Sequence, residues 1–280
     1  MIVLDMLNPR ANARAGADAA GFIKNQAGLV FAMTARDLKD RYAGQALGTI
    51  WAIVTPLLTM AVYVFVFTFI FQGRLGDTSG TAGFTGYVLS GLAPWMALQE
   101  CMARSTGAIS GNSNLVKQIV FPSEVLPLKT ALATLPILFI GIVIASVIAV
   151  SAGQATLTGY ILLLPLSVVS FVLFASGIAF LLAAIGVFFK DIKDIVTFFL
   201  AVGLFIHPIL YPPGGAPAWL EPVFTYSPVS HMIRCFHDAL SGGADPHPSS
   251  WVIFPVISLV TFLFGWRVFR WLKPTFGNAL

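Results

Sequence analysis

The sequence predicts an all-helical integral membrane protein. It has six transmembrane helices, an N-terminal interfacial amphipathic helix, and short re-entrant outer helices between spans five and six. Of its 280 residues, 57% are hydrophobic and only 10% are charged, whereas a soluble domain carries about 25% charged residues. This composition excludes an ordinary soluble domain and a disordered chain. The charge-free stretches and the distribution of Lys and Arg then predict how the chain crosses the bilayer.

The spans follow from the gaps between charged side chains. A membrane helix needs about 20 mostly apolar residues to cross roughly 30 Å of hydrocarbon, and the gaps hold 32, 22, 60, 26 and 21 residues. The gap of 60 is too long for one crossing, and a polar run at 151–159 divides it. The predicted spans are 46–71, 85–109, 128–150, 160–189, 195–210 and 251–271. Residues 1–45 then form a cytoplasmic N-terminus with the interfacial helix, and 46–280 form the transmembrane domain.

The basic residues predict the orientation. Fourteen of the 16 Lys and Arg residues lie on the side that holds both termini, and only Arg74 and Arg234 lie on the other. Cytoplasmic loops carry an excess of Lys and Arg, so both termini are expected in the cytoplasm. The net charge of +4 reflects these loops, and no nucleic acid partner is expected. Cys101 and Cys235 fall near opposite faces of the membrane, which excludes a disulfide between them.

Residues 22–45 predict an interfacial helix rather than a span. Its apolar face holds Phe31, Ala35, Leu38 and Tyr42. Such a helix lies along the membrane surface with this face toward lipid, and Asp37 with Arg41 forms a favourable i,i+4 pair. The simpler interpretation is a basic anchor for the first crossing. The alternative is that Arg36, Lys39 and Arg41 bind a lipid phosphate.

The cytoplasmic segment 110–128 is too apolar for a solvated loop. Asn112, Ser113 and Asn114 are candidates to cap a short helix that runs through Gln118. An ordinary loop is the alternative, but the apolar side chains predict docking on the membrane surface or on a partner protein. They are Leu115, Val116, Ile119, Val120 and Phe121.

Span five is short, because residues 195–210 give a helix of only about 24 Å. It leads into HPILYPPGGAPAWL, which contains four prolines and two glycines. Irregular backbone at membrane depth must be buried in protein or line a cavity. The stretch 219–240 has a helical pattern. It either re-enters the outer leaflet or forms an external loop held at the interface by Trp219 and Tyr226.

Motifs for bond chemistry are absent from the sequence. Because no G-x-x-x-x-G-K-[ST] loop occurs, ATP and Mg²⁺ are not expected on this chain, and neither a catalytic residue nor a metal site is predicted. His231, Cys235 and His237 lie close in sequence, but as exposed residues they are expected to lack the further ligands that zinc needs. The scarcity of ionisable groups within the spans argues against an ion-coupled carrier. Glu100 and Arg104, near the inner end of span two, are expected to form a structural i,i+4 pair.

Aromatic residues are abundant, with 24 Phe, 6 Trp and 6 Tyr. In membrane helices Phe usually faces lipid or packs in the core, and Trp and Tyr usually mark the interfaces. A functional interpretation is that rings in span one line a path for sugars, whose C–H faces stack on aromatic surfaces. The candidates are Trp51, Tyr63 and Phe67.

Four stretches of the chain resemble the ABC-2-type polysaccharide export permeases. Residues 36–71 (RDLKDRYAGQALGTIWAIVTPLLTMAVYVFVFTFIF) resemble the opening of that family, and residues 91–128 resemble its second span and coupling segment. The motif FFKDIKDI at 188–195 resembles the turn before span five. Residues 211–240 resemble the external segment, with Ser227 and Pro228 in place of the usual Asn-Pro. The resemblance covers about residues 25–275.

The resemblance implies a homodimer of six-helix subunits with two separate ATP-binding subunits, which would carry the ATP and Mg²⁺. It implies export of a lipid-linked polysaccharide, such as O antigen, across the bacterial cytoplasmic (inner) membrane. Residues 114–121 would then be the coupling helix, with Asn114, Leu115, Val116, Lys117, Ile119 and Phe121 as contacts. The inner gate, where cations would meet the lipid diphosphate, would include Arg36, Lys39, Arg41 and Arg104. The outer gate would include Tyr211, Trp219 and Arg234.

Three alternatives remain open on the sequence. The first is an exporter of drugs or small lipids from the same superfamily. The second is a membrane polyprenyl-phosphate glycosyltransferase, for which Asp37 and Asp40 are the only clustered acidic candidates. The third is an ion-coupled carrier, against which the scarcity of buried charge is the main argument.

Overall fold

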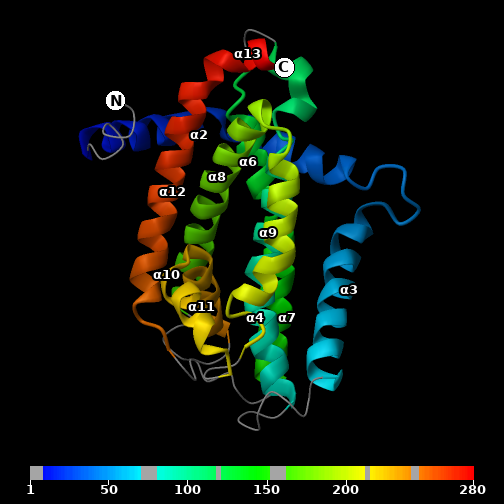
Figure 1. The fold of residues 1–280 in the computed structure, drawn as a ribbon. Helices are drawn as coiled ribbons and strands as arrows, with labels where there is room; N and C mark the ends of the chain where they lie inside the picture. The colour runs from blue at the N-terminus through cyan, green and yellow to red at the C-terminus, as the bar shows by residue number, and fades with distance from the viewer. Residues whose placement is uncertain (1–8, 71–80, 118–120, 152–161, 212–214, 241–245) are drawn as a thin grey trace.

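The computed structural model of the chain describes residues 9–70, 81–117, 121–151, 162–211, 215–240 and 246–280. Within these ranges the regular secondary structure is helical throughout, and no strand is assigned. Figure 1 shows a bundle of long helices with α2 (Pro9–Asp40) lying across one end. Two shorter helices, α10 (Glu221–Tyr226) and α11 (Pro228–Leu240), lie at the opposite end. The all-helical prediction is therefore confirmed for the described residues.

Helices occupy the places of all six predicted spans. They are α3 (Trp51–Phe65), α4 (Thr81–Ser105), α7 (Leu135–Ser151), α8 (Leu164–Phe188), α9 (Ile192–Ile206) and α12 (Ser250–Leu272). Among the described residues, three helical stretches are long and apolar enough to cross a bilayer, namely Val125–Ser151, Leu164–Phe188 and Ser250–Ala279. The first of these joins α6 (Val125–Leu132) to α7. The chain is thus a multi-pass helical membrane protein.

Several helix ends differ from the predicted ones for local reasons. Gly44 and Gly48 have φ values of +83° and +51°, which the right-handed helix does not allow, so α3 begins at Trp51 rather than at residue 46. At its other end α3 widens into a π-helical turn, Val66–Ile70. Helix α9 ends at Ile206, four residues early, because Pro208 forces the preceding His207 into an extended conformation (ψ 159°).

The interfacial helix is longer than predicted and turns a different face to the protein. Instead of residues 22–45, α2 covers Pro9–Asp40. Ala19, Val30 and Thr34 are buried against the bundle, whereas Phe31 is exposed. Phe22, Leu29 and Met33 pack against the same buried cluster as Val30, so the contact with the protein is largely apolar. Of the predicted lipid-facing residues, Phe31 and Ala35 are exposed, whereas Leu38 and Tyr42 are half-buried.

Two packing features fix the bundle. Helices α8 and α12 approach so closely that a Cβ atom on Gly177 would lie 2.6 Å from the Thr261 carbonyl oxygen, and one on Gly265 would overlap the Gly177 carbonyl. Small residues allow such close contact between membrane helices. At the end covered by α2, a buried aromatic cluster includes Trp266, Phe269 and Phe276, the last in α13 (Phe276–Ala279).

Candidate functional site

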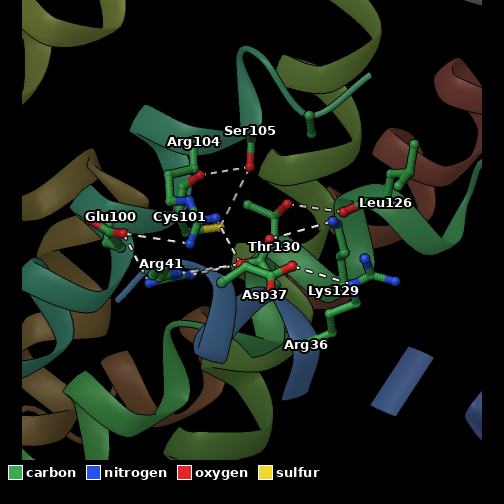
Figure 2. A network of polar contacts seen from close by, with 12 residues as sticks. Arg36, Asp37, Arg41, Glu100, Cys101, Arg104, Ser105, Leu126, Lys129 and Thr130 are labelled. Atoms are coloured by element: carbon green, nitrogen blue, oxygen red, sulfur yellow. Dashed lines mark hydrogen bonds and ion pairs between the residues drawn. The ribbon is translucent and has the colours of Figure 1, made fainter. Parts of the chain in front are cut away.

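A cluster of charged side chains joins the C-terminal ends of α2 and α4 to α6 (Figure 2). At its centre is Asp37, whose side chain is only 13% exposed. Its Oδ2 atom accepts hydrogen bonds from Arg104 Nη2 at 2.7 Å and from Arg41 Nη2 at 3.3 Å. Its Oδ1 atom lies 3.4 Å from Lys129 Nζ. Arg41, which directly follows α2, Arg104 of α4 and Lys129 of α6 thus share one half-buried carboxylate.

A second carboxylate, that of Glu100, completes this charged cluster. Arg41 Nη1 donates to Glu100 Oε1 at 3.1 Å, and Arg104 Nη1 lies 3.8 Å from the same oxygen. Among the described residues, the buried Arg104 Nη1 finds no hydrogen-bond acceptor. With three cations and two carboxylates, the cluster carries one excess positive charge. Because a buried charge is costly unless it is paired, the cluster holds α2, α4 and α6 together.

The structure separates the four cations that were predicted to form the inner gate. Arg41 and Arg104 lie in the charged cluster, and the predicted Asp37–Arg41 pair is confirmed at 3.3 Å. The Arg36 side chain is 82% exposed and pairs with Asp40 at 3.3 Å. Lys39 is also exposed. The predicted Glu100–Arg104 contact is present, but as one part of the larger cluster.

A cleft of about 520 Å³ begins at the charged cluster and extends between α3 and α4. Arg41 and Glu100 line it, so one end is charged. Its remaining lining combines aliphatic side chains, such as Leu92, Met96 and Ile137, with hydroxyl, amide and aromatic groups. These include Thr55, Thr59, Tyr63, Trp95, Gln99 and Thr197. This mixture of flat apolar rings and hydrogen-bonding groups suits a ligand with both kinds of surface.

The three aromatic candidates of span one have different outcomes. Tyr63 lines the cleft, and Trp51 is half-buried at the start of α3. The Phe67 side chain lies outside the described residues. Sequence reasoning missed Trp95, which is 1% exposed and packs against Gly203, where a Cβ atom would collide with the indole. The Trp95–Gly203 contact brings α9 up to α4, and only the fold reveals it.

The predicted coupling segment forms a 3-10 turn, Ser110–Asn112, followed by the short helix α5 (Ser113–Val116). The capping prediction is wrong, because the Asn112 amide donates back to the Ala108 carbonyl at 2.9 Å and no side chain caps α5. Because α5 ends at Val116, the helix does not reach Gln118 in the described residues.

The residues predicted to contact a partner divide into two groups. Asn114 and Lys117 are exposed, and Leu115 is half-buried. Val116 and Phe121 are half-buried against the chain's own aromatic cluster. Their apolar character is therefore explained in part by packing within the chain. Ile119 lies outside the described residues.

The end of the molecule that holds α11 contains the predicted outer-gate residues. The Tyr211 carbonyl accepts a hydrogen bond from Tyr87 of α4 at 2.9 Å. Trp219 is exposed, and Arg234 is half-buried in α11. Tyr87 also stacks on His237 of α11, with ring centroids 3.9 Å apart and planes within 4°. The α4 helix and α11 are therefore joined here by rings as well as by hydrogen bonds.

His237 fixes this outer contact. Its Nε2 lies 2.8 Å from the Pro208 carbonyl and its Nδ1 lies 2.7 Å from Ser90 Oγ. A carbonyl only accepts, so Nε2 carries the proton and Nδ1 is an acceptor. The single Ser90 hydroxyl proton has two acceptors in reach, Nδ1 and the Tyr87 carbonyl, each 2.7 Å from Ser90 Oγ. The ring occupies the space beside Gly91, where a Cβ atom would lie 2.7 Å from it. Burial, in a helix outside the predicted spans, lowers the pKa of His237 to about 4, so the ring is neutral at pH 7.

The expected exposure of His231, Cys235 and His237 is wrong. All three side chains are buried, because α11 packs against α4, α8 and α12. Asp238 is buried there too and accepts hydrogen bonds from Trp251 Nε1 at 3.0 Å and from the His247 backbone at 2.9 Å.

Sequence reasoning also missed Lys129 as a functional candidate. The available signal was an isolated charge at the start of a long apolar run (VLPLKTALATLPIL). A charge in that setting needs a buried partner, although its spacing does not identify Asp37 as that partner.

Comparison with known proteins identifies relatives that are named for O-antigen export or for polysialic acid transport. The O-antigen export system permease protein RfbA of Klebsiella pneumoniae is 24% identical over 259 residues, which cover 90% of this chain and 95% of that protein. The protein of the same name from Myxococcus xanthus is 31% identical over 185 residues, covering 66% and 68%. The polysialic acid transport protein KpsM of Escherichia coli is 23% identical over 242 residues, covering 86% and 92%.

The match at the level of the family covers most of the chain. Residues 28–240 fit the family described as ABC-2 type transporter. This range includes the charged cluster, the cleft, the coupling segment and α11. The chain is a membrane transport subunit, and it belongs to the ABC-2 type transporter family.

Proposed function

We propose that this chain is the permease subunit of an ATP-driven exporter of a lipid-linked polysaccharide, an O antigen or a similar glycan, in the bacterial cytoplasmic membrane. The observation that carries the proposal is the alignment of 86–90% of the chain with relatives named for O-antigen export and polysialic acid transport. In the proposed assembly, two copies of this chain form the pathway. Two ATP-binding subunits, which hold ATP and Mg²⁺, drive it.

The proposed topology has six spans with both termini in the cytoplasm. Two observations support it. The first and last described helices, α2 and α13, lie at one end of the bundle (Figure 1), as an even number of crossings requires. The same end carries the excess of Lys and Arg that marks a cytoplasmic face.

The charged cluster is the proposed site at which the lipid diphosphate enters the transporter. It carries one excess positive charge, and Arg104 Nη1 has no hydrogen-bond acceptor among the described residues. A guanidinium binds phosphate oxygens with matching geometry. Arg36 and Lys39, which are exposed on α2, would attract the anion before it reaches Arg41 and Arg104.

The cleft is the proposed first part of the glycan path. A sliding polymer needs weak, repeated contacts, and the cleft offers the Tyr63 ring beside hydroxyl and amide groups at Thr59 and Gln99. The glycosyltransferase alternative is disfavoured, because its candidate base Asp37 already holds three cations. This chain performs no bond chemistry in the proposal.

A test uses the chain reconstituted with its ATP-binding subunits in lipid nanodiscs. Thr59→Trp places a large ring in the cleft, whereas Leu58→Trp adds the same ring on the exposed side of α3. We expect lipid-linked polysaccharide to stimulate ATP hydrolysis, the Thr59→Trp variant to lose this stimulation, and the Leu58→Trp variant to retain it. Stimulation by small amphiphiles but not by the lipid-linked polymer would instead support the drug or small-lipid exporter.

A further inference from the structure

A buried carboxylate lies directly after the coupling segment. Glu124 is the residue before α6 begins, and it is 2% exposed. Its two oxygens accept hydrogen bonds from Lys273 Nζ at 2.8 and 2.7 Å, and Arg270 Nε lies 3.8 Å away. An unpaired carboxylate in this position would be strongly destabilising. The start of α6 is therefore tied to the C-terminal end of α12.

The same C-terminal end is tied to α2. Arg270 Nη1 lies 2.9 Å from Asp18 Oδ2, and Trp266 Nε1 donates to the same oxygen at 3.2 Å. The Arg270 guanidinium also lies over the Trp266 ring, 5.6 Å from its centroid. Arg270 thus contacts Glu124 on one side and Asp18 on the other, and links α6 to the N-terminal half of α2.

A second link joins α6 to the other half of α2. Lys129 lies five residues after Glu124, about 7.5 Å farther along the helix, and its Nζ is 3.4 Å from Asp37 (Figure 2). Asp18 and Asp37 are 19 residues apart, or about 28 Å along α2. The start of α6 is therefore linked by charges to two distant points on α2, directly at Asp37 and through Arg270 of α12 at Asp18.

We infer that Glu124, held in place by Lys273, is a positioning residue that transmits movement of the coupling segment to α2 through Arg270. This inference rests on the proposed function, because it assumes that ATP-binding subunits displace residues 114–121. Only Pro122 and Ser123 separate that segment from Glu124. A displacement of the segment moves the buried carboxylate, and the carboxylate carries the paired cations with it.

Charge pairs suit this task better than apolar contacts. Apolar side chains at the interface of α2 and α6, such as Val30 and Val125, attract without directional preference and tolerate sliding. A buried ion pair is costly to separate, so the paired groups move together. Allosteric coupling requires such a physical link between two sites that change state.

The experiment follows α2 during ATP binding in the complex of the full chain with its ATP-binding subunits. Hydrogen exchange is measured with and without ATP for Glu124→Gln, Lys273→Gln and the double variant. Asp194→Asn, an exposed carboxylate at the start of α9, is the control. In the wild type and the control, ATP is expected to change exchange both in the coupling segment and in α2.

In Glu124→Gln we expect the coupling segment to respond while the response of α2 falls by roughly tenfold, within the 5- to 150-fold range of typical coupling. Lys273→Gln should show the same loss, the double variant should be no worse than either single one, and Glu124→Asp should restore the response. Lys273 is more exposed than Glu124, so this variant gives the answer if Glu124→Gln does not assemble.

An unchanged α2 response in Lys273→Gln, additive losses in the double variant, or no α2 response in the wild type would each overturn the inference. None of these readouts requires a polysaccharide. A failure of the substrate assignment therefore appears separately, as absence of polymer-stimulated hydrolysis in the wild type.

Discussion

Replacing Asp37 by Asn tests whether the charged cluster holds α2 in place. The change keeps the shape but removes the charge that three cations share. A hydrogen bond to a charged group contributes about 1.5–3 kcal/mol, and removing one partner of a buried pair costs about 3–5 kcal/mol. Asn retains an acceptor for one cation. We therefore expect local opening of the last turns of α2 to become easier by about 2–4 kcal/mol.

Hydrogen exchange of the α2 amides measures this local opening. Since each 1.4 kcal/mol is a factor of ten, exchange near Asp37 should accelerate by about 30- to 700-fold. Asp40→Asn is the matched control, because Asp40 and its partner Arg36 have side chains that are 65% and 82% exposed. Exposed pairs contribute at most about 1 kcal/mol, or roughly fivefold. Equal acceleration in the two variants would refute the role given to the charged cluster.

Three further outcomes are expected. Introducing Asp at Val116 or Phe121 should uncouple ATP hydrolysis from export without unfolding the spans, as measured in reconstituted vesicles, and wild-type export would remove the coupling role. Cysteines introduced at Lys117 and Gly215 should be labelled from the inside and the outside of intact cells respectively, and the reverse pattern would overturn the topology. The pKa of His237 lies below that of an unfolded histidine, about 4 against 6.5, so its stabilising contribution is complete above pH 6.5 and declines as the pH falls toward 4. Thermal unfolding at pH 5 should show a loss of about 2 kcal/mol relative to pH 7, and His237→Gln should abolish that part of the difference.

The lengths of the uncharged stretches predicted the helices. Because placing a charge in hydrocarbon is costly, a membrane span appears in the sequence as a long run without charged residues. The ends of the helices depended on single residues. Pro208 shortened α9, and Gly44 with Gly48 delayed α3. These glycine and proline residues are visible in the sequence. However, only the folded chain shows that they, and not the ends of the apolar runs, decide where the helices begin and end.

The length of α2 and the face that it packs against the bundle depend on contacts with residues far away in the sequence. A local sequence pattern cannot predict such contacts. Its first turns are held by Asn12, which accepts a hydrogen bond from Arg267 at 2.7 Å, and by Asp18, which pairs with Arg270. These partners lie about 250 residues away in sequence. For the same reason, the sequence predicted Arg41 and Arg104 as related cations but did not reveal Lys129 between them.

The α4 helix makes specific contacts with neighbouring helices at both ends of the bundle. At one end Glu100 and Arg104 pair with Arg41 and Asp37 at the C-terminal end of α2, and at the other Tyr87 and Ser90 contact His237 of α11. Both sets of contacts belong to one helix, so a tilt of α4 displaces residues at each end. A movement of α4 that changes its contacts with α2 is therefore expected to change its contacts with α11 as well, which would couple the two ends of the bundle.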